Sequence, residues 1–174
     1  RMVENDFHPR YDVKHKEYIY KIWNNPIKNP FFAHSAYHVP QKYSDETLEK
    51  MNEAAQHLLG EHDFSCFEKT GGNNATSICT ITEAAWSTYI PDHCRMMGTD
   101  WKEGDYIVFR IKANRFLRNM VRAIVGSLIE VGRGKRNPSW IAGLIANGTR
   151  SDAGTSVPGK ALFFCGASYG EVEK

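Results

Sequence analysis

The stretch "RFLRNMVRAIVGSLIEV", residues 115–131, decides the fold, because it carries the strongest helical pattern in the chain. Its apolar residues recur every three or four positions and form one stripe, which predicts an amphipathic helix packed on a core. The stripe comprises Leu117, Met120, Val121, Ile124, Val125, Leu128 and Ile129. Asn114 stands directly before the stretch and is predicted to cap the helix.

The segments around this helix predict a sheet and two further helices. Alternating β-branched and aromatic residues predict strands at 16–24, 76–90, 104–113 and 160–169. Ser44 is predicted to cap a second helix that Gly60 stops. Asn137 and Pro138 open a third, which Gly148 closes. Strands and helices do not alternate regularly, so the predicted fold class is α+β, a mostly antiparallel sheet packed with helices.

The composition is that of an ordinary globular chain. The 174 residues are 41% hydrophobic and 24% charged, so we expect one domain over residues 1–174. No apolar run reaches membrane-spanning length, and no membrane contact is predicted. The four cysteines form no CxxC pair. They are expected to be reduced thiols in a cytoplasmic protein, with zinc ligation by Cys66, Cys79 and Cys94 as the alternative.

Positive charge is concentrated around the long helix. Residues 110–136 hold eight Lys or Arg residues and a single acid, Glu130. This excess indicates a polyanion partner such as RNA, although a solvated helix face accounts for it equally well. The candidate phosphate-binding side chains here are Arg110, Lys112, Arg115 and Arg118. Within the predicted helix, Arg115, Arg118 and Arg122 would share one face.

Arg122 is unusual among these cations because it lies beside the apolar stripe. A guanidinium there is costly to desolvate unless a carboxylate or phosphate meets it. The pattern alone leaves two interpretations of Arg122 open. One is a side chain that extends its charged head into water, and the other is a binding-site residue with an anionic partner.

Tyrosines in the first predicted strand form a second candidate site. Tyr18 and Tyr20 alternate and so share a face, and Arg10 and Tyr11 precede them. Tyrosines on a sheet with nearby cations are suited to stacking on a base. The alternative is that they are core tyrosines with satisfied hydroxyls.

The stretch "RSDAG", residues 150–154, contains a candidate nucleophile. Asp152 stands between an arginine and a small-residue turn, as a nucleophile beside its counter-ion would. It also follows a predicted helix end, where a plain loop residue is equally expected.

Four segments in this order resemble the C-terminal half of the tRNA pseudouridine synthase A family. They are "NDFHPRYDVKHKEYIYKI" (5–22), "LLGEHDFSCF" (58–67), "IKANRFLRNMVRAIVGSLIEVGRG" (111–134) and "AGTSVPGKALFFCGASY" (153–169). The resemblance implies an isomerase that converts uridine to pseudouridine in the anticodon stem-loop of tRNA, without a cofactor or metal. It also implies a homodimer, and two α/β halves that share a mostly antiparallel sheet with a basic cleft between them.

The family's functional residues fall on specific positions of this chain. The resemblance places the active-site tyrosine on Tyr18, the arginine that partners the catalytic aspartate on Arg122, and an apolar residue of the uracil pocket on Leu162. Arg10 joins the cations around the long helix as a candidate RNA contact. The chain departs from the family at Ala161, where glycine is common, and at Pro9, where alanine is usual.

The resemblance also bears on Asp152. The family's nucleophile lies in an Arg-Thr-Asp-Ala-Gly-Val-His motif that precedes the part resembled here, whereas "RSDAG" matches an ordinary loop. We therefore expect that Asp152 is not the nucleophile, that the half with the catalytic aspartate is absent from this chain, and that the chain alone is inactive. An RNA-binding module or a dimerisation domain without isomerase activity are the alternatives.

Overall fold

The structure is a computed structural model that describes residues 8, 13–71, 75–90, 92, 96 and 102–170. Its centre is a six-stranded sheet in the order β2-β1-β5-β4-β3, with β6 paired to β1. The strands are β1 (His15–Trp23), β2 (Tyr37–His38), β3 (Gly60–Asp63), β4 (Ile78–Thr88), β5 (Tyr106–Ala113) and β6 (Leu162–Ser168). Every pairing is antiparallel except that of β1 with β2. The predicted α+β class with a mostly antiparallel sheet is confirmed.

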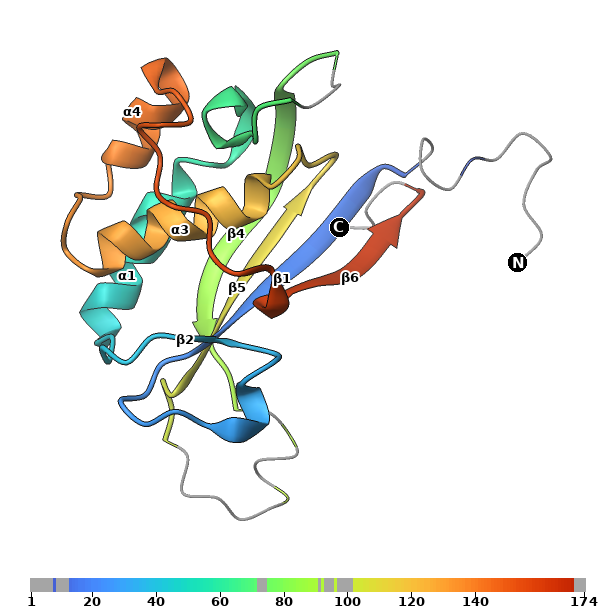
Figure 1. Cartoon of the computed structure of the whole chain (residues 1–174). Coiled ribbons are helices and arrows are strands. Elements are labelled where there is room, and N and C mark those ends of the chain that lie inside the picture. Colours follow the sequence, from blue (N-terminus) through green and yellow to red (C-terminus); the bar gives the residue numbers. More distant parts are fainter. Residues whose placement is uncertain are drawn as a thin grey trace.

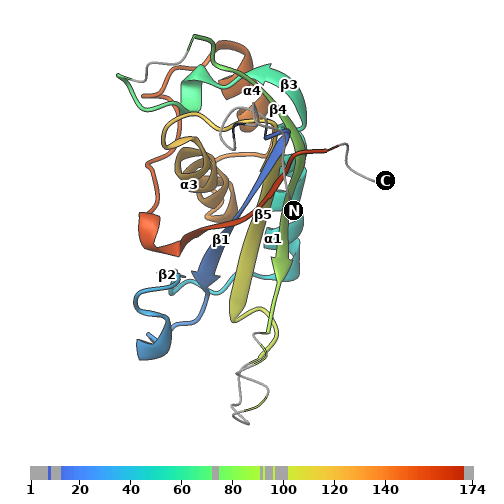
Figure 2. The ribbon, with the colours of Figure 1, turned by 90° about the vertical axis from the view of Figure 1, so that its right-hand side faces the viewer.

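Three helices cover one face of this sheet, as Figures 1 and 2 show: α1 (Asp45–Gln56), α3 (Met120–Gly132) and α4 (Trp140–Asn147). The main core lies between helices and sheet, where alternate residues of β5 such as Ile107, Phe109 and Ile111 are fully buried. The intervening residues Tyr106 and Val108 belong to a smaller cluster on the other face. This period of two gives the sheet a helix-covered face and an opposite face.

The long helix begins later than its pattern predicts, so the prediction that Asn114 caps it is wrong. α3 starts at Met120, after Asn119, whose backbone is left-handed with φ of 66°. Asn114 instead extends the sheet, because its backbone N donates to Thr80 O at 3.1 Å and its Oδ1 accepts from Thr80 N at 2.9 Å. The predicted common helix face is therefore wrong as well, because Arg115 and Arg118 lie in the connection before α3.

The other two helices follow their local signals more closely. Ser44 caps α1, and its Oγ accepts from the Thr47 backbone N at 3.2 Å. α1 ends at Gln56, earlier than predicted, and Gly60 instead starts β3 with φ of 98°. α4 ends at Asn147 and Gly148 is its C-cap, as predicted, but the helix begins at Trp140 and not at the predicted Asn137–Pro138.

The segment before β6 packs directly on α3. A Cβ at Gly126 would lie 1.9 Å from Thr155 O, so only glycine allows this approach. Ser127 Oγ accepts from Gly154 N at 2.8 Å, which fixes the segment along the helix. The segment then passes through the short 3-10 helix η3 (Gly159–Ala161) into β6. α3 and the β1–β6 edge are thereby held together.

Within the described residues, no helix is both long and apolar enough to cross a membrane.

Candidate functional site

Tyr18 lies on the helix-covered face of β1, near the edge that pairs with β6. Its ring contacts Phe116 at 5.2 Å and Phe164 at 5.3 Å between centroids, both edge-on. Phe164 lies opposite Tyr18 in β6 and is 57% exposed. Burial raises the pKa of the Tyr18 hydroxyl, so the side chain is a neutral phenol at physiological pH. An aromatic surface with one open side is thus present here.

Arg122 lies in the first turn of α3 and is anchored by one edge of its guanidinium. Its Nε donates to Val157 O at 2.6 Å, and its own backbone O accepts from Val157 N at 3.2 Å. A Cβ on Gly159 would lie 3.7 Å from the Arg122 terminal nitrogen Nη1. None of the ion pairs among the described residues involves Arg122. The terminal nitrogens therefore have no carboxylate partner in this part of the chain.

Tyr20 joins these groups to the loop that leads into β6. It is fully buried, and its hydroxyl donates to Pro158 O at 2.8 Å. Burial and Tyr37 raise the pKa of Tyr20, while the charge of Arg122 lowers it. Leu162, partly buried, lies opposite Tyr20 in the β1–β6 pairing. Adjacent carbonyls of one loop are thus held by Arg122 and by Tyr20.

The structure therefore places Tyr18, Arg122 and Leu162 along one edge of the helix-covered face. Tyr18 of β1 pairs with Phe164 of β6, two residues after Leu162, which pairs with Tyr20. Arg122 bonds Val157 in the loop that leads through η3 to Leu162. Sequence reasoning did not single out Phe164 or the 157–159 loop. The alternation of β6 could have indicated Phe164, but nothing local indicates that the loop lies on α3.

Arg110 and Lys112 lie on the opposite face of the sheet. They alternate in β5 with the core residues Phe109 and Ile111. The Arg110 side chain forms an ion pair with Glu17 and lies 3.9 Å from a Glu83 oxygen. These two cations therefore do not meet Tyr18 or Arg122.

The other predicted cations are spread along the chain. Arg118 is exposed, and its backbone O accepts from Lys69 N at 3.0 Å. Arg115 is partly buried, and its positive charge lowers the pKa of the Cys79 thiol, although burial raises that pKa more. Arg10, like Pro9, Tyr11 and Cys94, lies outside the described residues.

Asp152 occupies a turn after α4. Its Oδ2 accepts from the Thr149 backbone N at 2.9 Å and from Thr149 Oγ1 at 2.6 Å. These bonds lower the pKa of the Asp152 carboxyl. Neighbouring Arg150 donates to Gly154 O and Ser156 Oγ and not to Asp152. The carboxylate thus closes a local turn.

The described cysteines carry free thiols. Cys66 and Cys79 are buried, and burial raises the pKa of each thiol to about 11, so both are protonated at neutral pH. No group of three or more His, Cys, Asp or Glu side chains suited to a metal ion occurs among the residues that the structure describes.

Comparison with known proteins places this chain in a family. The model of the family described as tRNA pseudouridine synthase matches residues 54–170, two thirds of the chain, including α3, η3 and β6. The chain belongs to the tRNA pseudouridine synthase family. Arg122 and Leu162 lie within the matched region, and Tyr18 lies on the strand that pairs with β6.

Relatives in several bacteria extend the match over nearly the whole chain. The protein named tRNA pseudouridine synthase A of Bacteroides thetaiotaomicron is 41% identical over 173 residues, covering 98% of this chain and 58% of the relative. Those of Anoxybacillus flavithermus and Colwellia psychrerythraea are 38% and 34% identical, over 96% and 98% of this chain and 61% and 60% of theirs. The chain thus spans about three-fifths of the length of these relatives.

Proposed function

We propose that the protein to which this chain belongs isomerises uridine to pseudouridine in the anticodon stem-loop of tRNA. One observation carries the proposal: the Arg122 guanidinium is fixed through Nε to the loop that leads into β6, and it has no carboxylate partner among the described residues. A cation held in this way is suited to receive a carboxylate from another part of the protein.

The reaction breaks the glycosidic bond between N1 of uracil and C1′ of ribose, and forms a bond between C5 and C1′. One proton leaves C5 and one is gained at N1, so the product is an isomer and the balance requires no oxidant or cofactor. An aspartate outside this chain supplies the nucleophilic carboxylate. Arg122 holds that carboxylate ionised and oriented, because an opposite charge at contact lowers a carboxyl pKa.

The aromatic surface receives the base. Uridine must leave the stem or loop stack before its glycosidic bond can be reached, and a flipped base is held by stacking and apolar contact. Tyr18 stacks on the uracil and, as a neutral phenol, can pass a proton. Leu162 packs on the ring, and Arg115, Arg118 and Arg10 contact phosphates, which position RNA without reading its sequence.

The proposal extends to the whole protein. We expect a cytoplasmic homodimer that needs no cofactor, and a chain that is inactive alone because it lacks the nucleophile. The bonding of Asp152 supports this, because its carboxylate accepts two hydrogen bonds from Thr149 and forms no ion pair with Arg122.

The test compares two proteins on an unmodified tRNA transcript: this chain, and the same chain joined to the part of its relatives that it does not cover. We expect pseudouridine only with the longer protein. In it, Arg122→Met should lower the rate by about two orders of magnitude or more, since unpairing a buried carboxylate costs about 3–5 kcal/mol. The affinity for tRNA should be largely kept. Turnover by the chain alone that is lost on Asp152→Ala would refute the assignment.

A further inference from the structure

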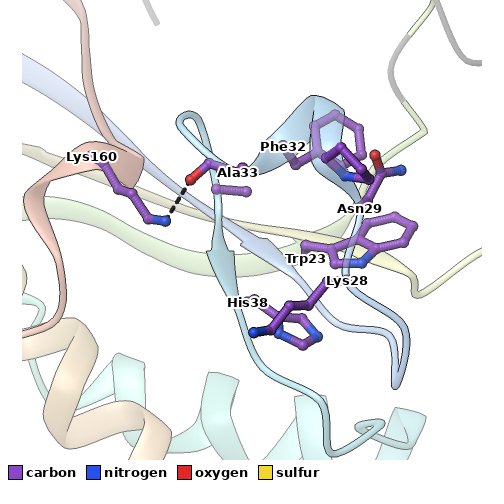
Figure 3. Close-up of a pocket in the computed structure, with 9 residues that line it drawn as sticks. Trp23, Lys28, Asn29, Phe32, Ala33, His38 and Lys160 are labelled. Carbon is purple, nitrogen blue, oxygen red and sulfur yellow. Dashed lines mark hydrogen bonds between the residues drawn. The ribbon is translucent and has the colours of Figure 1, made fainter.

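A cavity of about 410 Å³ is lined by Lys160 of η3 and by residues of the loop that follows β1 (Figure 3). It opens between the loop that follows β1 and the η3 segment. Its lining residues are Trp23, Lys28, Asn29, Pro30, Phe32, Ala33, Ala36, His38 and Lys160. The volume falls in the range of small-molecule sites and is large enough for a nucleotide.

The charge of this cavity is positive. Lys28 and Lys160 line it, and no carboxylate is among its lining residues. Among the described residues, neither lysine belongs to an ion pair. Lys160 Nζ donates to Ala33 O at 2.5 Å, which leaves two of its three donor hydrogens for an anion.

The wall opposite Lys160 is apolar and firmly held. The rings of Trp23 and Phe32 lie 5.2 Å apart between centroids and are almost completely buried by their neighbours. Trp23 Nε1 donates to Ile27 O at 2.7 Å, and His38 Nε2 is bonded to Asn25 O at 2.8 Å. These bonds fix the loop that forms the wall, so the cavity combines an apolar side held by hydrogen bonds with two lysine side chains.

The position of the cavity links it to the proposed site. Gly159 lies against the Arg122 guanidinium, and the next residue, Lys160, lines the cavity. Consecutive Cα atoms are about 3.8 Å apart, so one short turn separates the two places. Tyr20 holds the start of this turn through Pro158 O. Trp23 and Phe32 belong to the cluster on the sheet face away from the helices, so an RNA strand whose uridine lies beside Arg122 would pass around the sheet edge at η3 to bring its neighbouring nucleotide to the cavity.

We infer that this cavity binds a nucleotide that flanks the target uridine, and we call it the flanking-nucleotide pocket. The ribose or base lies against the apolar wall of Trp23 and Phe32, and the phosphate meets Lys28 and Lys160. The inference rests on the proposed function, because it takes the RNA strand to pass Arg122. Phosphate on flexible lysines with an apolar surface beside it is a common way to hold single-stranded RNA.

The test uses the chain, the trinucleotide UpUpU as probe and the indole N–H resonance of Trp23, assigned from the Trp23→Phe spectrum. We expect the probe to shift this resonance, and Lys160→Gln to weaken binding roughly threefold to tenfold. Lys160→Arg should restore most of the affinity. Lys50→Gln is the matched control, because Lys50 is an exposed lysine on α1 paired with Glu46, and it should leave binding unchanged. Equal melting temperatures would show that Lys160→Gln leaves the fold intact.

Two further probes identify the ligand class. Uridine and inorganic phosphate should each bind more weakly than UpUpU. An unmoved Trp23 resonance, equal affinity for Lys160→Gln and the unchanged chain, or equal binding of phosphate and UpUpU would overturn the flanking-nucleotide pocket. Pseudouridine formation is measured separately. Isomerisation by the longer protein while Trp23 stays unmoved refutes the pocket alone, and Lys160-dependent binding without isomerisation by the longer protein refutes the proposed function alone.

Discussion

Two tyrosines one residue apart on β1 have different surroundings. The Tyr20 hydroxyl is buried and bonded to Pro158 O, whereas the Tyr18 hydroxyl forms no hydrogen bond with another of the described residues. The Tyr18 ring packs edge-on against Phe116 and Phe164, and the three rings form the aromatic surface of the candidate site. Tyr20 therefore holds the loop that carries the site, and Tyr18 remains available for a ligand.

This difference predicts unequal effects on stability. Tyr20→Phe should lower the free energy of unfolding by about 1–2 kcal/mol, because it leaves the Pro158 carbonyl without its donor. Tyr18→Phe, the matched control, should change it by less than about 0.5 kcal/mol. Urea denaturation of both variants measures the two values. Equal losses would mean that the Tyr20–Pro158 bond does not stabilise the loop.

At the scale of elements, α3 and the segment before β6 act as one unit. Gly126 lets Thr155 approach the helix backbone, Ser127 bonds Gly154, and Arg122 bonds Val157. Three successive contacts thus run along one side of the helix. The orientation of Arg122 depends on this packing and not on α3 alone.

Gly126→Ala should disturb this unit. The added methyl group would meet Thr155 O at 1.9 Å, so the segment must move, at a cost of about 1–3 kcal/mol in unfolding free energy. Gly143→Ala in α4 is the control, because nothing lies within 4 Å of its Cβ position. That change should stabilise the chain by up to about 1 kcal/mol, since alanine favours helix over glycine. Thermal unfolding measures both, and a neutral Gly126→Ala would contradict the close packing.

Local signals predict the elements of this fold better than their ends. The alternation of β1, β4, β5 and β6 and the cap at Ser44 depend on neighbouring residues, and the structure confirms them. The start of α3 could not be predicted in this way, because Asn114 is bonded to Thr80, which lies 34 residues earlier. Helical periodicity continues through residues 115–119 even though tertiary bonds hold them outside the helix.

The candidate site is predictable only in part, for the same reason. The position of a charged residue beside an apolar stripe singled out Arg122. Only the family resemblance favoured an ionic partner for Arg122 over a side chain that extends into water. The bond from Arg122 to Val157 joins residues 35 apart, and the bond from Tyr20 to Pro158 joins residues 138 apart. No local pattern encodes such contacts, and the flanking-nucleotide pocket depends on them as well.

At the scale of the whole molecule, the cations separate onto different sides of the sheet. Arg110 and Lys112 lie on the face away from the helices, where Glu17 and Glu83 engage Arg110. Arg118 lies exposed in the connection that leads into α3. Because Tyr18 and Arg122 lie on the helix-covered side, the proposed function leads us to expect that RNA reaching them passes Arg118 and not Arg110.

The dependence of tRNA binding on salt should show this separation. Each phosphate contact on a duplex contributes about 0.9 to the slope of log affinity against log salt concentration, and somewhat less on a single strand. Arg118→Ala should therefore weaken binding and reduce the slope by roughly one contact. Arg110→Ala, its control, should leave the slope unchanged, because the charge removed already faces Glu17 within the protein. Filter binding at several salt concentrations gives both slopes. If Arg110→Ala flattened the slope and Arg118→Ala did not, the RNA would lie on the opposite face of the sheet, away from Arg122. The proposed function would then lose its path for the strand.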